Sequence, residues 1–291
     1  MKRLLHYEIA EKLGEGKNGI TWSAIDSTSQ RAVVIKEMRR PHAADEAWRQ
    51  RFLASMEQIN ALEHAGIARF YALEEADGCW FVARQYVDGQ DVSALAISAP
   101  VEYDRWLNLA LELACTLKSI HDTGLVHGNV TSSNVFVDSQ GRTRLVDSGL
   151  GAIATGLPNA EQSVFLAPEL SRGAQATPSG DLYALGVVLY HLLTGQIPQG
   201  SPPVVFSQFS EQQAPGVARL LLGRLLAASP GERFASAEEL ILTIQAMMSL
   251  ETEPATVERR KWSLGPRQYL MISVLVLLLV ILWLVVTSQP K

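Results

Sequence analysis

Cysteine is scarce in this sequence of 291 residues, which contains only Cys79 and Cys115. Two cysteines exclude a disulfide-rich scaffold and any zinc site built from four thiolates. In a reducing compartment, isolated thiols are ordinary core residues. The sequence therefore predicts a fold stabilised by a hydrophobic core, and its length suits one large domain or two medium ones.

An excess of positive charge is also absent. The 25 Lys and Arg residues against 30 Asp and Glu residues give a net charge of −5, which argues against a general nucleic-acid binder. The charge is uneven, because residues 1–250 hold 20 basic and 27 acidic residues and residues 251–291 hold five and three. With 47% hydrophobic and 19% charged residues, the chain is neither a disordered tail nor a coiled coil.

One long apolar run stands near the end of the sequence, from Tyr269 to Val286, and Ser273 is its one clearly polar residue. A helix of this length spans roughly 27 Å, close to the ~30 Å of a bilayer's hydrocarbon core. We therefore expect a transmembrane helix over 268–287 that contacts the lipid bilayer, followed by a short tail over 288–291. The competing interpretation is a buried helix of a soluble fold.

The basic residues around this run predict its orientation. Four lie before it and one lies after it: Arg259, Arg260, Lys261 and Arg267, then Lys291. The positive-inside rule places residues 1–267 in the cytoplasm. No apolar run near the N-terminus is long enough for a signal peptide. We expect a C-terminally anchored single-pass protein, at the inner membrane in a bacterium, with a basic juxtamembrane linker over 251–267.

Hydrophobic periodicity predicts two regions of different character. Alternating or β-rich patterns predict short strands in the first region, over 8–13, 20–25, 32–37, 68–73 and 79–86. Helical spacing predicts one helix there, over 45–62, with Trp48, Phe52, Met56 and Ile59 on one face. The second region reads as helices with one small hairpin, over 103–121, 135–146, 181–193, 214–226 and 237–248, after a turn at 87–90.

A glycine motif lies between the first two predicted strands. Residues 13–19, Leu-Gly-Glu-Gly-Lys-Asn-Gly, contain G-x-G-x-x-G. Alone, the motif could mark a plain hairpin. A dinucleotide-binding fold needs a helix after the glycines, whereas here a strand is predicted. A strand, a glycine turn and a second strand resemble the phosphate-covering loop of protein kinases.

Further motifs follow in the order of that family. Val-Val-Ile-Lys ends at Lys36, Asp-Ser-Gly begins at Asp147, Ala-Pro-Glu ends at Glu169, and His-Gly-Asn-Val-Thr-Ser-Ser-Asn covers 127–134. Over residues 7–248 the chain resembles the protein kinase superfamily, nearest to bacterial-type Ser/Thr kinases. The resemblance implies an α+β, two-lobed domain over 7–250, with a β-rich lobe over about 7–87 and a helical lobe over about 88–250.

The resemblance also implies a site for ATP and Mg²⁺. Lys36 would contact the phosphates, and Asn134 and Asp147 would bind the metal. Glu169 would pair with Arg233, and Asp181 would begin a buried helix. The residues that match the family's nucleotide-binding positions are Gly14, Gly16, Gly19, Thr21, Val34, Lys36, Arg84, Gln85, Val87 and Phe136.

Four departures surround the phosphoryl-transfer step. Asn129 stands at the position of the catalytic Asp, and an amide is a far weaker base than a carboxylate. Thr131 replaces a lysine that touches the transferred group, Gly128 replaces an arginine, and Gln162 replaces a threonine. Together they predict that this step is no longer supported.

Two further departures concern the partners of Lys36 and the adenine site. Ser55 falls where the family has a glutamate that pairs with the lysine, unless a rotated helix brings Glu57 to Lys36. Arg84 stands at an ordinarily apolar position, where a buried arginine needs an acid such as Glu57 or lies along the back wall of the site. Val34 and Thr21 replace the alanine and valine that contact adenine. We expect at most weak nucleotide binding.

Three functions are consistent with these residues. The first is a membrane-anchored pseudokinase that regulates a protein partner. The second is an atypical but active Ser/Thr kinase that phosphorylates a protein substrate, because positioning supplies most of the catalysis in this class. The third is a scaffold that binds no nucleotide.

Overall fold

The computed structural model describes residues 3–16, 19–38, 46–98, 101–149, 163–198 and 215–252. The chain divides into two units, Met1–Met248 and Ser249–Lys291. Gln162, residues 253–267 of the predicted linker, the predicted transmembrane helix over 268–287 and the tail lie outside the described residues. Within the described ranges, no helix is long and apolar enough to cross a membrane.

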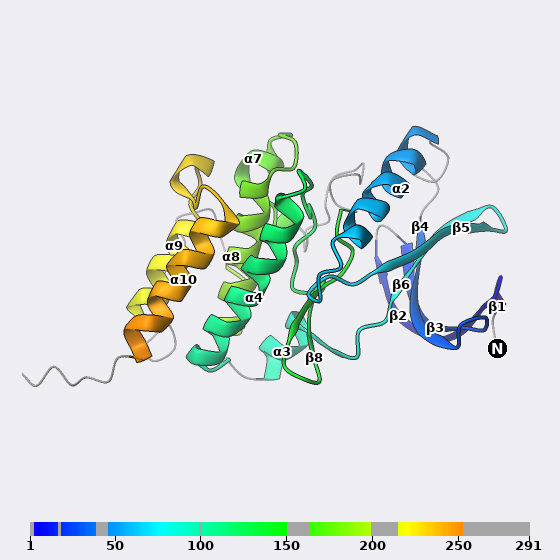
Figure 1. The fold of residues 1–291 in the computed structure, drawn as a ribbon, viewed down its shortest axis with the longest axis horizontal. Helices are drawn as coiled ribbons and strands as arrows, with labels where there is room; N and C mark the ends of the chain where they lie inside the picture. Colours follow the sequence, from blue (N-terminus) through cyan, green and yellow to red (C-terminus); the bar gives the residue numbers. More distant parts are fainter. Residues whose placement is uncertain are drawn as a thin grey trace, which may run out of the picture. The chain divides into compact units, whose positions relative to one another are not determined.

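The first part of the chain forms a six-stranded antiparallel sheet with the order β1-β2-β3-β4-β6-β5 (Figure 1). Its strands are β1 (Arg3–Leu4), β2 (Tyr7–Gly16), β3 (Gly19–Asp26), β4 (Arg31–Met38), β5 (Phe70–Ala76) and β6 (Cys79–Gln85). The five predicted strands are confirmed. The two-residue β1 was not predicted, because it is too short to show a period.

Helix α2 (Glu46–Ala61) packs against this sheet. Its buried residues are Trp48, Phe52, Met56 and Ile59, which are the four that the periodicity placed on one face. They form an apolar cluster with Phe70 and Val82 of the sheet, among others. The helix is therefore stabilised by the burial of this face.

The second part of the chain is mostly helical. Its elements are β7 (Gly89–Asp91), α3 (Val92–Ser98), α4 (Tyr103–His121), β8 (Val135–Asp138), β9 (Thr143–Leu145), α7 (Pro168–Ser171), α8 (Pro178–Thr194), α9 (Gly216–Leu225), η1 (Pro230–Glu232) and α10 (Ala237–Thr252). The predicted helices and hairpin are confirmed. The turn predicted at 87–90 is wrong in its second half, because Gly89 and Gln90 pair with β8 as part of β7.

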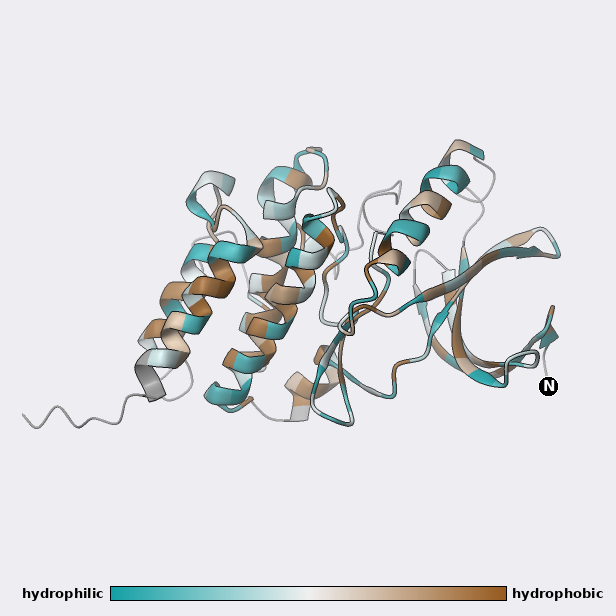
Figure 2. Cartoon of the chain, viewed as in Figure 1, coloured by the Kyte–Doolittle hydropathy of each residue, from teal (hydrophilic) through white to brown (hydrophobic). Residues whose placement is uncertain are grey.

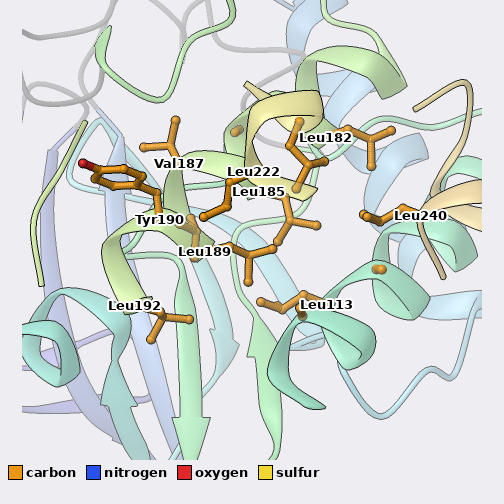
Figure 3. Close-up of a cluster of buried hydrophobic side chains, with 14 of the residues drawn as sticks. Leu113, Leu182, Leu185, Val187, Leu189, Tyr190, Leu192, Leu222 and Leu240 are labelled. Carbon is orange, nitrogen blue, oxygen red and sulfur yellow. The ribbon is translucent and has the colours of Figure 1, made fainter. Parts of the chain in front are cut away.

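Helix α8 is buried along nearly its whole length, and local signals set its ends. The Thr177 hydroxyl accepts a hydrogen bond from the Gly180 amide at 3.2 Å, and Pro178 occupies the first helical position. Gly195 ends the helix in the left-handed region at φ 70°. Side chains from α4, α9 and α10 pack on α8, among them Leu113, Leu222 and Leu240 (Figure 3). In the helical part, apolar residues gather between neighbouring helices (Figure 2).

Candidate functional site

The strand register places four of the predicted site residues on one face of the sheet. Lys36 of β4 lies opposite Thr21 of β3, and Val34 of β4 lies opposite Arg84 of β6. Cross-strand partners point to the same face, and residues two apart on a strand also share a face. Thr21, Val34, Lys36 and Arg84 therefore share one surface, and Lys36 and Arg84 are diagonal neighbours.

Asp147 meets both cations from the other side. It follows β9, where Val146 donates its amide hydrogen to Asn134 O at 3.0 Å and Gly149 donates to His127 O at 3.0 Å. These bonds hold the turn, and Asp147 has a positive φ of 58°. The residue is only 3% exposed. Oδ2 is hydrogen-bonded to Lys36 Nζ, and Oδ1 lies 2.9 Å from Arg84 Nε.

The electrostatics of this trio are strongly coupled. Burial by itself would raise the pKa of Asp147, but the charges of Lys36 and Arg84 outweigh it and lower the pKa to about 2. The carboxylate is therefore ionised at any physiological pH. The Arg84 contact is a charge contact without hydrogen-bond alignment, since neither Nε nor Oδ1 has a hydrogen-bond partner in the described part of the chain. Arg84 also donates from Nη1 to Gln85 O at 3.1 Å.

Helix α2 gives Lys36 no carboxylate. Ser55 faces the turn that follows Asp147, because a Cβ placed on Gly149 would lie 3.8 Å from Ser55 Cβ. Glu57 is exposed, and no ion pair joins it to Lys36 or Arg84 among the described residues. The interpretation in which a rotated helix brings Glu57 to Lys36 does not hold, because its apolar face fixes the rotation of α2. The partner of Arg84 is Asp147 and not Glu57.

The loop over 127–134 contains no carboxylate and no lysine or arginine. His127 is fully buried, and its Nδ1 accepts a hydrogen bond from the Asn129 amide at 3.2 Å. The Thr131 hydroxyl lies 3.0 Å from the Ser133 hydroxyl. Asn134 donates from Nδ2 to Asn129 O at 2.9 Å. The side chains that stand at the predicted catalytic positions are therefore uncharged.

Asp181, at the start of α8, holds this loop in place. Its carboxylate accepts hydrogen bonds from the amides of His127 and Gly128, both at 2.8 Å. His121 Nε2 lies 2.9 Å from the same carboxylate. The contact with His121 was missed from the sequence, because 60 residues separate the two and His121 carries no motif. The Asp181 carboxylate is thus occupied by these structural hydrogen bonds and is not available as a base.

The glycines of the motif differ in what they do. Gly16 and Gly19 are paired across β2 and β3, and Gly19 has φ 136°. A Cβ on Gly19 would also collide with the backbone carbonyl of Glu37, so glycine is required there by the fold itself. A Cβ placed on Gly14 would meet no atom of the described residues within 4 Å. Residues 17 and 18, at the tip of the turn, lie outside the described residues.

Of the remaining predicted nucleotide residues, Val87 and Phe136 belong to a separate apolar cluster and Gln85 ends strand β6. Val87 is buried beside Val146 and Ala68, and Phe136 packs against them. This apolar cluster adjoins Asp147 through Val146. The side chain of Gln85 turns to the backbone instead, where its Oε1 accepts from the Arg69 amide at 3.2 Å.

Glu169 and Arg233 form the expected pair. Arg233 Nη1 and Nη2 donate to the two carboxylate oxygens of Glu169 at 2.7 and 2.8 Å, and Arg233 is 2% exposed. Arg233 also donates to the carbonyls of Ala227 and Ser179. Such a bidentate pair is geometrically specific. It joins α7 to the segments around α8 and η1.

The fit of a magnesium ion to this site is incomplete. The Asn134 side chain donates from Nδ2, which leaves its oxygen available, as a metal ligand requires. Asp147 does not fit as arranged, because a cation faces each of its two oxygens. Among the described residues, no group of three His, Cys, Asp or Glu side chains could hold a metal.

Comparison with known proteins bears on both the fold and the site. Residues 7–239 match the family model of the protein kinase domain. Serine/threonine-protein kinase PrkC of Bacillus subtilis is 28% identical over 253 residues, which cover 80% of this chain and 39% of that protein. Serine/threonine-protein kinase pkn3 of Myxococcus xanthus is 26% identical over 293 residues. The match covers 90% of this chain and 52% of that protein. The chain thus spans about half or less of the length of these relatives.

Solved structures that are similar to this chain are also protein kinase domains. The kinase domain of PknI from Mycobacterium tuberculosis is 28% identical, with a TM-score of 0.68 and coverage of 84% of this chain and 96% of that one. A double mutant of the same domain is 30% identical, with a TM-score of 0.67 and coverage of 84% and 95%.

Proposed function

Because the chain belongs to the protein kinase domain family and has that family's two-lobed fold, we propose that it is a membrane-anchored pseudokinase. It binds nucleotide weakly and transfers little or no phosphoryl group. Its role is to bind and regulate a protein partner at the cytoplasmic face of a membrane.

The observation that carries the proposal is the uncharged loop over 127–134. A hydroxyl that attacks the γ-phosphate needs a base, and such help contributes about 10²–10⁴ in rate. Asn129 supplies only an amide, and His127 is buried with Nδ1 already bonded. Asp181 and Asp147 are each held by other groups. Among the residues of the site that the structure describes, no carboxylate is therefore placed to accept the proton.

Weak nucleotide binding is supported by the residues on the sheet face. Lys36 and Arg84 present positive charge toward the site, and the cluster of Val87 and Phe136 offers an apolar surface. Val34 and Arg84 are larger than the residues that the family resemblance implies at those positions, which leaves less room for adenine.

Membrane anchoring rests on the apolar run Tyr269–Val286 and on the basic residues before it. Together these features favour a single span with the kinase-like domain in the cytoplasm. A partner at the membrane follows from this placement.

Two other functions have specific support. An active but atypical Ser/Thr kinase is favoured by the relatives, which are named serine/threonine-protein kinases, and by the intact pair of Glu169 and Arg233. A scaffold that binds no nucleotide is favoured by the Arg84 contact with Asp147.

One experiment separates the three functions. The full-length chain, solubilised in mild detergent, is tested for Mg-ATP binding and for γ-phosphate transfer to itself and to a generic protein acceptor. Asn129→Asp restores a carboxylate at the position of the base, and Lys36→Met removes the cation that contacts the phosphates. We expect the wild type to bind without transfer and Lys36→Met to bind less.

The outcomes are distinct. Transfer by the wild type that Lys36→Met abolishes would establish an active kinase and overturn the proposal. Transfer that appears only in Asn129→Asp supports it and identifies the missing base as the main block. Neither binding nor transfer in any variant would identify the chain as a scaffold.

A further inference from the structure

Arg84 places a permanent positive charge beside a carboxylate that the family resemblance assigns to a metal. The arginine is 6% exposed, and its Nε lies 2.9 Å from Asp147 Oδ1. The other oxygen, Oδ2, is hydrogen-bonded to Lys36. Each oxygen that could coordinate a cation therefore already faces one supplied by the chain.

The charges of this trio do not cancel. Lys36 and Arg84 contribute two positive charges against the one negative charge of Asp147, all at sites that are mostly shielded from water. A guanidinium stays protonated in proteins, so this surplus is permanent. The surplus repels a divalent cation and attracts an anion, and a guanidinium is well suited to bind phosphate oxygens.

We propose that Arg84 takes the place of a divalent metal at Asp147, so that this chain binds a nucleoside triphosphate through Arg84 and Lys36 without Mg²⁺. The proposal deepens the proposed function and rests on its claim that nucleotide binds. Arg84 neutralises both the carboxylate and part of the polyphosphate charge, which is the electrostatic role that a metal would otherwise fill.

The register of the sheet explains how one substitution achieves this. Arg84 lies opposite Val34, and Val34 is two residues from Lys36 on the same face. A long side chain at 84 can therefore reach the carboxylate that Lys36 already contacts. Nη1 is held by Gln85 O at 3.1 Å and Nε lies beside Asp147, so a phosphate oxygen would bind to Nη2 while the rest of the guanidinium stays in place.

The test compares the full-length wild type in detergent with three variants. Arg84→Met removes the charge and keeps an apolar side chain of similar length. Arg84→Lys keeps the charge. Arg69→Met is the matched control, since Arg69 is an exposed cation beside the same sheet, with its side chain 57% exposed. ATP affinity is measured by calorimetry with Mg²⁺ and with a chelator, and Mn²⁺ binding without nucleotide is measured by electron paramagnetic resonance.

We expect the wild type, Arg84→Lys and Arg69→Met to bind ATP equally well with Mg²⁺ and with the chelator. Arg84→Met should bind ATP at least about tenfold better with Mg²⁺ than without it, a change of ~1.4 kcal/mol. It should also bind Mn²⁺ at least about tenfold more tightly than the wild type does. Melting curves without ligand check that each variant is folded, and Arg84→Gln replaces Arg84→Met if the latter unfolds.

Three results would overturn the inference. The first is wild-type ATP binding that the chelator abolishes. The second is Mn²⁺ binding by the wild type as tight as by Arg84→Met. The third is a wild type that binds no ATP in either condition. The pseudokinase assignment is tested separately, by the phosphoryl-transfer assay described above. A failure of that assignment is therefore distinguishable from a failure of the inference about Arg84.

Discussion

The ion-pair partner of Lys36 depends on which residue α2 presents to the site. Because α2 presents Ser55 toward the site, Lys36 pairs with Asp147 instead of a helix carboxylate. Removing one partner of a buried ion pair is ordinarily costly, at about 3–5 kcal/mol. Here Arg84 also contacts Asp147, so Lys36→Met still leaves the carboxylate with a cation. This makes Lys36→Met a usable variant for the binding and transfer assays.

His127 predicts a dependence of stability on pH. Burial lowers its pKa in the folded protein, so the imidazole stays neutral there while the unfolded chain takes up a proton near pH 6.5. Stability is therefore complete above that pH and is lost as the pH falls below it, by up to about 1.4 kcal/mol per pH unit. We expect His127→Gln to reduce the slope of stability against pH between pH 7 and pH 5, measured by denaturant unfolding.

The comparison with the variant is necessary because burial also lowers the pKa values of His64 and His191. Asp147 contributes in a separate range, since its stabilisation is lost only as the pH falls from 3.8 toward about 2. An unchanged slope in His127→Gln would mean that the folded protein protonates His127 as readily as the unfolded chain does.

At the scale of elements, the packing of α8 against α9 depends on a glycine. A Cβ on Gly186 would lie 2.8 Å from Leu225 Cβ and 3.1 Å from Leu226, and both leucines are buried. Gly186→Ala should therefore destabilise the protein by about 1–3 kcal/mol through overpacking. The measurement is the free energy of unfolding in urea.

Gly223, on α9, is the matched control. No atom of the described residues lies within 4 Å of a Cβ placed there, and the residue is exposed. Gly223→Ala should raise the free energy of unfolding by roughly 0.5–1 kcal/mol, because alanine loses less conformational freedom in a helix. The packing argument requires opposite signs for the two variants, and equal effects would contradict it.

The longer elements could be predicted from the sequence, and the shortest could not. Helices α2 and α4 have apolar stripes over four or more turns, so their period is visible. Helices α3 and α7 have seven and four residues, too few to show one. Helix α3 packs on α8, a contact that lies about 90 residues away along the chain and leaves no local signal.

At the scale of the whole molecule, we expect the acidic kinase-like domain to lie in the cytoplasm and the apolar C-terminal segment to lie in the membrane. We expect the full-length protein to remain in the membrane pellet after alkaline extraction and to be released by detergent. Leu278→Arg, in the middle of the predicted span, should shift it toward the soluble fraction, since a central arginine costs about 2.5–3.5 kcal/mol of insertion free energy.

Leu220→Arg is the control for added charge, because Leu220 is 77% exposed on α9. It should leave the protein in the membrane pellet. A wild type found entirely in the soluble fraction would contradict the predicted span.

The sequence by itself determined the family and the order of the motifs, and the resemblance to that family predicts that Asn129 stands at the position of a catalytic carboxylate. These properties depend on residue identity and on local spacing, and both can be read along the chain. Only the tertiary structure decided which side chains meet. Glu57 is exposed to solvent because the apolar face of α2 packs inward. Asp181 contacts His121. Asp147 forms ion pairs with both Lys36 and Arg84. The reason is physical: residues 63 or 111 positions apart in sequence become neighbours only once strand register and core packing bring them together.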